Sequence, residues 1–137
     1  MSVSDPIADA ITKIRNAYLA GHKRVFVNHC NIVASLVSIL AQENFINDFE
    51  IIPQDIKKKI YRKQIYLSLR YTDNQESVLR GIKRVSKPGR RVYVDAKNIP
   101  SIFNNMGCAI LSTSRGVIVD RQARKMKIGG EYICNVW

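Results

Sequence analysis

The sequence has few cysteines and few histidines, which limits the metal and redox chemistry that it can support. Its cysteines, Cys30, Cys108 and Cys134, lack C-x-x-C spacing, and each stands among apolar neighbours. With His22 and His29 as the only histidines, the chain has no cluster of ligands with the spacing of a zinc site. We expect reduced cysteines in the core, a reducing compartment, and neither a metal nor another cofactor.

The sequence also lacks a long apolar run and the common catalytic motifs. No run reaches the roughly 18 apolar residues of a spanning helix, and the acids Asp5 and Asp9 are unlike a mitochondrial presequence. No phosphate-binding loop or nucleophile elbow is present. His29 beside Cys30 is weak evidence for a catalytic pair, because a nucleophile needs its base across space. We expect no membrane partner, no small-molecule substrate and no enzymatic activity.

Acidic residues are scarce relative to basic ones. The chain has 11 Asp and Glu against 22 Lys and Arg, a formal net charge of +11, within 137 residues that are 46% hydrophobic. This hydrophobic content suffices for a core. The basic excess favours a nucleic acid, whose phosphates release counterions when Lys or Arg neutralises them. A basic structural adaptor for acidic protein surfaces is the alternative that charge leaves open.

The first half of the chain predicts the order helix, strand, helix, strand, strand. Asp5 and Pro6 are typical of a helix start, and Gly21 of a helix end. The next elements are expected at residues 24–27 (strand), 31–43 (buried helix), 45–52 (strand) and 64–71 (strand). A polar run at residues 72–77 is the expected boundary. It separates a first lobe, residues 1–73, from a second, residues 74–137.

The second half is predicted to be mainly β. Strands at 79–85 and 91–94 are expected to form a hairpin around a type II turn at Pro88 and Gly89. Residues 98–106 allow a short helix or turn. The remaining elements are strands at 108–111, 117–119 and 131–137, and a helix at 121–127 that Asp120 caps and Gly129 ends. The expected fold class is α+β, with an N-terminal α-β-α-β-β lobe and a mainly β C-terminal lobe.

Three segments of the second half carry groups that RNA recognition uses. They are the hydroxyls at 112–114, the basic turn at 86–91 and the double glycine before Glu131, with Tyr93 as a stacking surface. Gly116, Gly129 and Gly130 would let backbone approach a ligand closely. Taken singly, each segment is an ordinary turn or strand end. Glu131 could accept from a base amino group or pair with a nearby arginine, and both alternatives remain open.

Four segments have a familiar order: DPIADAITKIRNA, LAQENFI, GIKRVSKPGRRVYV and STSRGVIVDRQARKMKIGGEYICNVW. Through them the chain resembles the bacterial-type small-subunit ribosomal protein S-eight family. The resemblance implies two packed α/β lobes and a primary binder of small-subunit rRNA. Family members bind a central-domain stem with a distorted internal loop and help to organise the platform. Some also bind their own messenger RNA and repress translation.

The resemblance also implies which residues contact RNA. It assigns the contacting loop to residues 112–114, with Gly130 and Glu131 beside it and Tyr93 as the aromatic neighbour. Supporting contacts to the RNA backbone are expected at Thr12, Arg15 and Lys87. With the basic turn and Arg115, which stands where the family usually has lysine, the predicted RNA-binding residues are Ser112, Thr113, Ser114, Arg115, Gly130, Glu131, Tyr93, Lys87, Arg91, Thr12 and Arg15.

Two other departures from the family pattern affect local structure. Asn44 replaces a usual glycine and still tolerates a left-handed helix end, and Val119 replaces a usual threonine, which leaves Asp120 to cap the last helix. The expected partners are small-subunit rRNA, neighbouring small-subunit ribosomal proteins and the protein's own messenger RNA. The expected location is the ribosome in the bacterial cytoplasm, or the matrix or stroma of an organelle. The role of the basic connection at 57–63 is the least defined.

Overall fold

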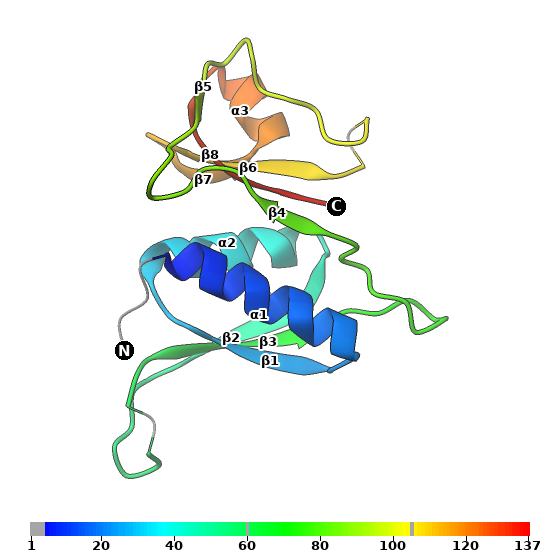
Figure 1. The fold of residues 1–137 in the computed structure, drawn as a ribbon, viewed down its shortest axis with the longest axis vertical. Helices are drawn as coiled ribbons and strands as arrows, with labels where there is room; N and C mark the ends of the chain where they lie inside the picture. Colours follow the sequence, from blue (N-terminus) through cyan, green and yellow to red (C-terminus); the bar gives the residue numbers. More distant parts are fainter. Residues whose placement is uncertain (1–4, 60, 105) are drawn as a thin grey trace. The chain divides into compact units, whose positions relative to one another are not determined.

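A computed structural model describes residues 5–59, 61–104 and 106–137 of the chain. The chain divides into two compact units, one ending at Leu79 and one running from Arg80 to Trp137. Each unit combines helix with an antiparallel sheet, which confirms the α+β fold class (Figure 1). The lobe boundary expected between residues 73 and 74 stays a prediction.

The first unit has the predicted order of elements. They are α1 (Pro6–Ala20), β1 (Arg24–Asn28), α2 (Asn31–Gln42), β2 (Ile46–Ile52) and β3 (Gln64–Leu69). The three strands form an antiparallel sheet in the order β1-β3-β2, and both helices lie on one side of it (Figure 1). Burial alternates along β3, with Ile65, Leu67 and Leu69 buried in the core, because successive side chains of a strand point to opposite faces.

The helix ends of this unit follow the local sequence. The carboxylate of Asp5 accepts a hydrogen bond from the N–H of Ala8 at 3.2 Å, with Pro6 at the first helical position. Gly21 ends α1 in the left-handed conformation (φ 73°). Asn44, just after α2, has φ 64°, which confirms that asparagine occupies the left-handed position here.

A buried tyrosine ties α1 to the sheet. The hydroxyl of Tyr18 donates to the carbonyl of Phe45 at 2.6 Å and accepts from the backbone N–H of Arg70 at 3.2 Å. Burial is the main cause that raises the pKa of Tyr18. One side chain thus satisfies polar groups at the ends of two strands that the sequence separates widely.

The second unit is built around its last strand. Its elements are β4 (Ile82–Arg84), β5 (Tyr93–Val94), β6 (Cys108–Thr113), β7 (Gly116–Val119), α3 (Asp120–Met126) and β8 (Gly130–Val136). The sheet order is β4-β8-β6-β7, and β5 also pairs with β8. A core cluster joins α3 to the sheet and consists of Ile99, Ala109, Leu111, Ile118, Ala123 and Tyr132.

The hairpin expected between residues 79–85 and 91–94 is wrong. Both β4 and β5 pair with β8 and not with each other, β4 opposite residues 134–136 and β5 opposite residues 130–131. The intervening turn closes at Lys87 and Arg90, whose backbones exchange hydrogen bonds of 3.0 and 2.9 Å. Gly89 does not have a positive φ, so the turn is not type II.

The predicted capping of α3 is also wrong. Asp120 is the first helical residue instead of the cap, and Val119 precedes it without a side-chain cap bond. The Asp120 carboxylate is buried and accepts a charged hydrogen bond from Arg124 at 3.0 Å. Lys127 takes the left-handed position (φ 58°) that ends the helix two residues before Gly129. Among the described residues of 98–106, the structure has turns and no helix.

Candidate nucleic-acid interface

The interface face is the side of the second sheet that points away from α3, defined by Tyr93, Glu131, Ser112 and Val117. These residues lie directly opposite one another on β5, β8, β6 and β7, where partners in antiparallel strands are about 4.5–5.5 Å apart. The next row, which contains Leu111, belongs to the core beneath α3. Because side chains alternate, the interface-face row points the other way. Tyr93 is 69% exposed and is available for stacking.

The β6–β7 turn forms one end of this face. Thr113 stabilises the turn, since its hydroxyl donates to the carbonyl of Gly116 at 2.8 Å and accepts from the N–H of Arg115 at 3.1 Å. Gly116 has φ 98°, a conformation that favours glycine. Ser114 and Arg115 are exposed at the tip. In the described part of the chain, no protein group hydrogen-bonds the side-chain hydroxyls of Ser112 or Ser114.

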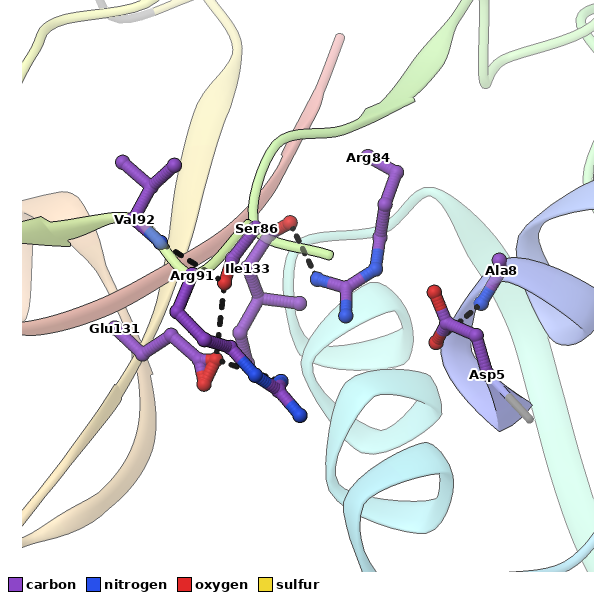
Figure 2. Close-up of polar contacts among 8 residues, drawn as sticks. All are labelled: Asp5, Ala8, Arg84, Ser86, Arg91, Val92, Glu131 and Ile133. Carbon is purple, nitrogen blue, oxygen red and sulfur yellow. Dashed lines mark hydrogen bonds and ion pairs between the residues drawn. The ribbon is translucent and has the colours of Figure 1, made fainter. Parts of the chain in front are cut away.

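At the other end of the interface face, a buried serine holds the neighbouring residues in place. Ser86 is 0% exposed, and its hydroxyl donates to Glu131 Oε2 at 3.1 Å and accepts from the N–H of Val92 at 3.2 Å (Figure 2). Arg91 Nη1 also contacts Glu131 Oε2 at 3.2 Å. The arginine pairing is therefore the alternative that the structure supports for Glu131. A carboxylate on β8 thus holds both ends of the segment between β4 and β5.

The family assignment rests on the length of the match. The model of the family described as ribosomal protein S8 matches residues 5–137. The chain belongs to this family. It is 48% identical to the small ribosomal subunit protein uS8 of Geotalea daltonii, 49% identical to that of Geobacter metallireducens and 47% identical to that of Lactobacillus delbrueckii subsp. bulgaricus. Each alignment spans all 137 residues and all of both chains.

The S8 family is a family of ribosomal structural proteins and not an enzyme family. Membership of it agrees with the basic excess of the chain and with its lack of common catalytic motifs. The described helices include none that is long and apolar enough to cross a membrane. Nor do the described residues contain a cluster of three or more metal-ligating side chains. Burial raises the pKa of the Cys134 thiol to about 12, so that this thiol stays protonated at neutral pH.

The double glycine of this S8-family chain has a structural role that the sequence did not reveal. A Cβ at Gly130 would lie 2.2 Å from the carbonyl oxygen of Ser112, and one at Gly129 would lie 2.2 Å from that of Val94. Both glycines therefore let β8 approach its neighbouring strands. The close backbone approach predicted at these residues is made within the sheet, next to the interface face.

The structure brings together most of the predicted site residues. Tyr93, Glu131 and Ser112 are adjacent on neighbouring strands, and Arg91 contacts Glu131. Gly130, which has no Cβ, lets its strand lie close to the backbone of Ser112. The turn at 113–115 follows directly along β6. Lys87 is exposed in the turn between β4 and β5.

The remaining two predicted residues, Thr12 and Arg15, are exposed on α1 of the first unit. Their assignment to the RNA site stays a prediction. The sequence does not reveal the role of Ser86, which it places only within the basic turn at 86–91. Val85 and Val92, which stand at the two ends of this turn, pack partly against the core, and these apolar residues are the signal that could have indicated a buried hydroxyl.

Proposed function

We propose that this protein is a structural constituent of the small ribosomal subunit that binds small-subunit rRNA through the interface face and the β6–β7 turn. The observation that carries the proposal is the strand register that sets exposed Tyr93 beside Glu131 and Ser112. The family match and the printed names of the relatives, which are small-subunit proteins, support the same conclusion.

The face combines two kinds of contact. Lys87 and Arg115 are exposed cations that attract phosphates and position the RNA, while the hydroxyls of Ser112 and Ser114 supply short-range selectivity. The hydroxyl proton of Thr113 already bonds the Gly116 carbonyl, so we assign Thr113 to shaping the turn. Tyr93 offers its ring to an unstacked base or a ribose.

The finer assignment concerns the RNA and its context. We take the ligand to be a central-domain stem with an irregular internal loop, because exposed base edges and hydroxyls need an opened groove. Binding this stem would help to assemble the platform, next to other small-subunit proteins. Binding to the protein's own messenger RNA, with repression of translation, would use the same face. Bacterial relatives support a place in cytoplasmic ribosomes.

The test is a titration of the purified protein against an irregular small-subunit stem and against a fully paired stem of equal length, at physiological salt. We expect a clear preference for the irregular stem. Ser114→Ala should weaken that complex by about 1–3 kcal/mol through loss of a buried hydrogen bond and should leave binding to the paired stem nearly unchanged. Ser68→Ala, on β3 of the first unit, is the matched control.

Equal, weak and salt-labile binding of the wild-type protein to both stems would contradict the proposal. It would favour a basic adaptor for which RNA is incidental. Equal losses on both stems with Ser114→Ala would instead contradict the division between phosphate attraction and hydroxyl selectivity.

A further inference from the structure

The connection between β2 and β3, residues 53–63, concentrates positive charge in the first unit. It contains one acid, Asp55, and five basic residues, Lys57, Lys58, Lys59, Arg62 and Lys63. All five basic side chains are exposed. Figure 1 shows the connection extending away from the sheet beyond the ends of β2 and β3. Its charge thus faces solvent and belongs to the first unit, whereas the interface face is part of the second unit.

The described residues of the connection form an ordered turn at its tip. The carboxylate of Asp55 accepts a hydrogen bond from the backbone N–H of Lys57 at 3.0 Å. The N–H of Lys59 donates to the carbonyl of Ile56 at 3.1 Å, and Lys59 is left-handed with φ 60°. At the exit of the connection, the N–H of His29 donates to the carbonyl of Lys63 at 3.0 Å. The backbone therefore presents the three consecutive lysines in a defined arrangement.

The charge of these lysines is not neutralised within the described chain. No ion pair joins Lys57, Lys58 or Lys59 to a described acidic residue, and the nearby Asp55 is engaged with backbone. Clustered like charges repel one another, so the arrangement gains most from a ligand with closely spaced negative charges. Phosphates along a nucleic-acid strand have this spacing.

The connection also exposes an aromatic ring beside the cations. Tyr61 is 67% exposed and Ile56 is 71% exposed. Proteins that bind single-stranded or irregular RNA combine positive charge, which contacts phosphates, with exposed aromatic rings, on which bases stack. By contrast, exposed Phe26 and partly buried Tyr66 on the first sheet pack against each other, with ring centroids 4.4 Å apart.

We infer that the β2–β3 connection is a second RNA-contacting element, which binds the sugar–phosphate backbone of small-subunit rRNA flanking the stem held by the interface face. The inference rests on the proposed function and extends it to the first unit. Lys57, Lys58 and Lys59 contact phosphates, and Tyr61 packs against an unpaired nucleotide. Such contacts add affinity and orientation without reading sequence.

The test compares two RNAs and two variants of the full chain. The RNAs are the short irregular stem and a longer small-subunit fragment that contains the same stem with its flanking helices. The variants are Lys57→Gln/Lys58→Gln/Lys59→Gln and the charge-preserving control Lys57→Arg/Lys58→Arg/Lys59→Arg. On the long fragment, we expect the Gln variant to lose about tenfold or more in affinity. Its salt slope should fall by about two to three, because each phosphate contact contributes roughly 0.9.

On the short stem, the Gln variant should stay within about threefold of wild type, and the Arg variant should resemble wild type on both RNAs. Ultraviolet crosslinking to the long fragment, followed by peptide mapping, should identify Tyr61. An unchanged affinity for the long fragment, or equal losses on both RNAs, would overturn the inference. So would unchanged RNA binding with loss of binding to vesicles of anionic phospholipid, which would assign the lysines to a membrane surface.

The same experiment separates this inference from the proposed function. A wild-type protein that prefers the irregular stem over a paired stem supports the interface face, whatever the Gln variant does. If wild type shows no such preference but the Gln variant still loses affinity for the long fragment, the proposed function fails and the role of the connection stands.

Discussion

Ser86→Ala removes the buried hydroxyl that joins the segment between β4 and β5 to the carboxylate on β8. The substitution deletes the 3.1 Å hydrogen bond to Glu131 and leaves the N–H of Val92 without its 3.2 Å partner. A bond to a charged group contributes about 1.5–3 kcal/mol, and a buried unpaired N–H costs about 1–3 kcal/mol. Glu131 keeps Arg91 and is 18% exposed, so water offsets part of its loss. We expect a net destabilisation of about 2–3 kcal/mol.

The assay is urea denaturation followed by the fluorescence of Trp137, the single tryptophan of the chain. Trp137 lies in the second unit and packs against Phe103, with ring centroids 5.5 Å apart, so that it reports on the unit that contains Ser86. Linear extrapolation gives the free energy of unfolding. Two further variants serve as controls with smaller expected effects. Arg91→Ala, which removes a half-exposed ion pair, should cost less than about 1 kcal/mol, and exposed Ser114→Ala less than about 0.5 kcal/mol.

A Ser86→Ala protein as stable as Ser114→Ala would refute the reasoning, because the buried hydroxyl would then contribute nothing to the unit. The two variants should also affect the RNA titration by different routes. At temperatures where both remain folded, Ser114→Ala loses affinity directly, whereas Ser86→Ala acts through the position of Glu131 and Arg91. A Ser86→Thr variant, which keeps the hydroxyl, tests whether the added methyl group fits the fully buried site.

Two further predictions use residues outside this network. Gly130→Ala should destabilise the protein by about 3 kcal/mol or more, because its Cβ would lie 2.2 Å from a backbone carbonyl oxygen. Gly89→Ala has open space and no positive φ and should be neutral or stabilising by up to about 1 kcal/mol; equal urea midpoints for the two would contradict this. The Cys134 thiol, with a pKa raised by burial to about 12, should resist iodoacetamide at pH 8 until urea unfolds the chain. Mass spectrometry that finds Cys134 alkylated in the native protein would show the thiol to be accessible.

Local signals in the sequence predicted the first unit well. The Asp5 cap, the Gly21 helix end and the alternation along β3 each depend on residues that are close in the sequence, and the structure has all three. The left-handed Asn44 is of the same kind. Such signals work because capping and strand alternation depend on interactions within a few residues.

The second unit was harder to predict because its decisive pairings are distant in sequence. Residues 79–94 have the pattern of a hairpin, but β4 and β5 both pair with β8. No local rule distinguishes a turn that joins paired neighbours from one that joins two strands along the edge of a third. The same distance hid the partners of Ser86 and of Gly130, which lie on β8 and β6.

The helix α3 shows a second reason why local sequence signals can mispredict structure. A carboxylate before a basic helical segment predicts a cap, yet Asp120 is buried within the first turn and pairs with Arg124. Tertiary burial decided its role. For the candidate site, the sequence assigned Ser112, Thr113 and Ser114 alike to RNA contact, and only the hydrogen bonds of the structure show that the Thr113 hydroxyl is engaged within the turn.

The strand order of the second unit has a consequence for the timing of protein synthesis. Strands β4, β5 and β6 all find their partner in β8, which the ribosome makes after every other element. A nascent chain that lacks β8 can form the local β6–β7 hairpin, but it cannot align Tyr93 with Ser112. Closing such long-range pairings is slow compared with forming local structure. The interface face therefore forms only once β8 is available for pairing, which makes its assembly a late step in the folding of the second unit.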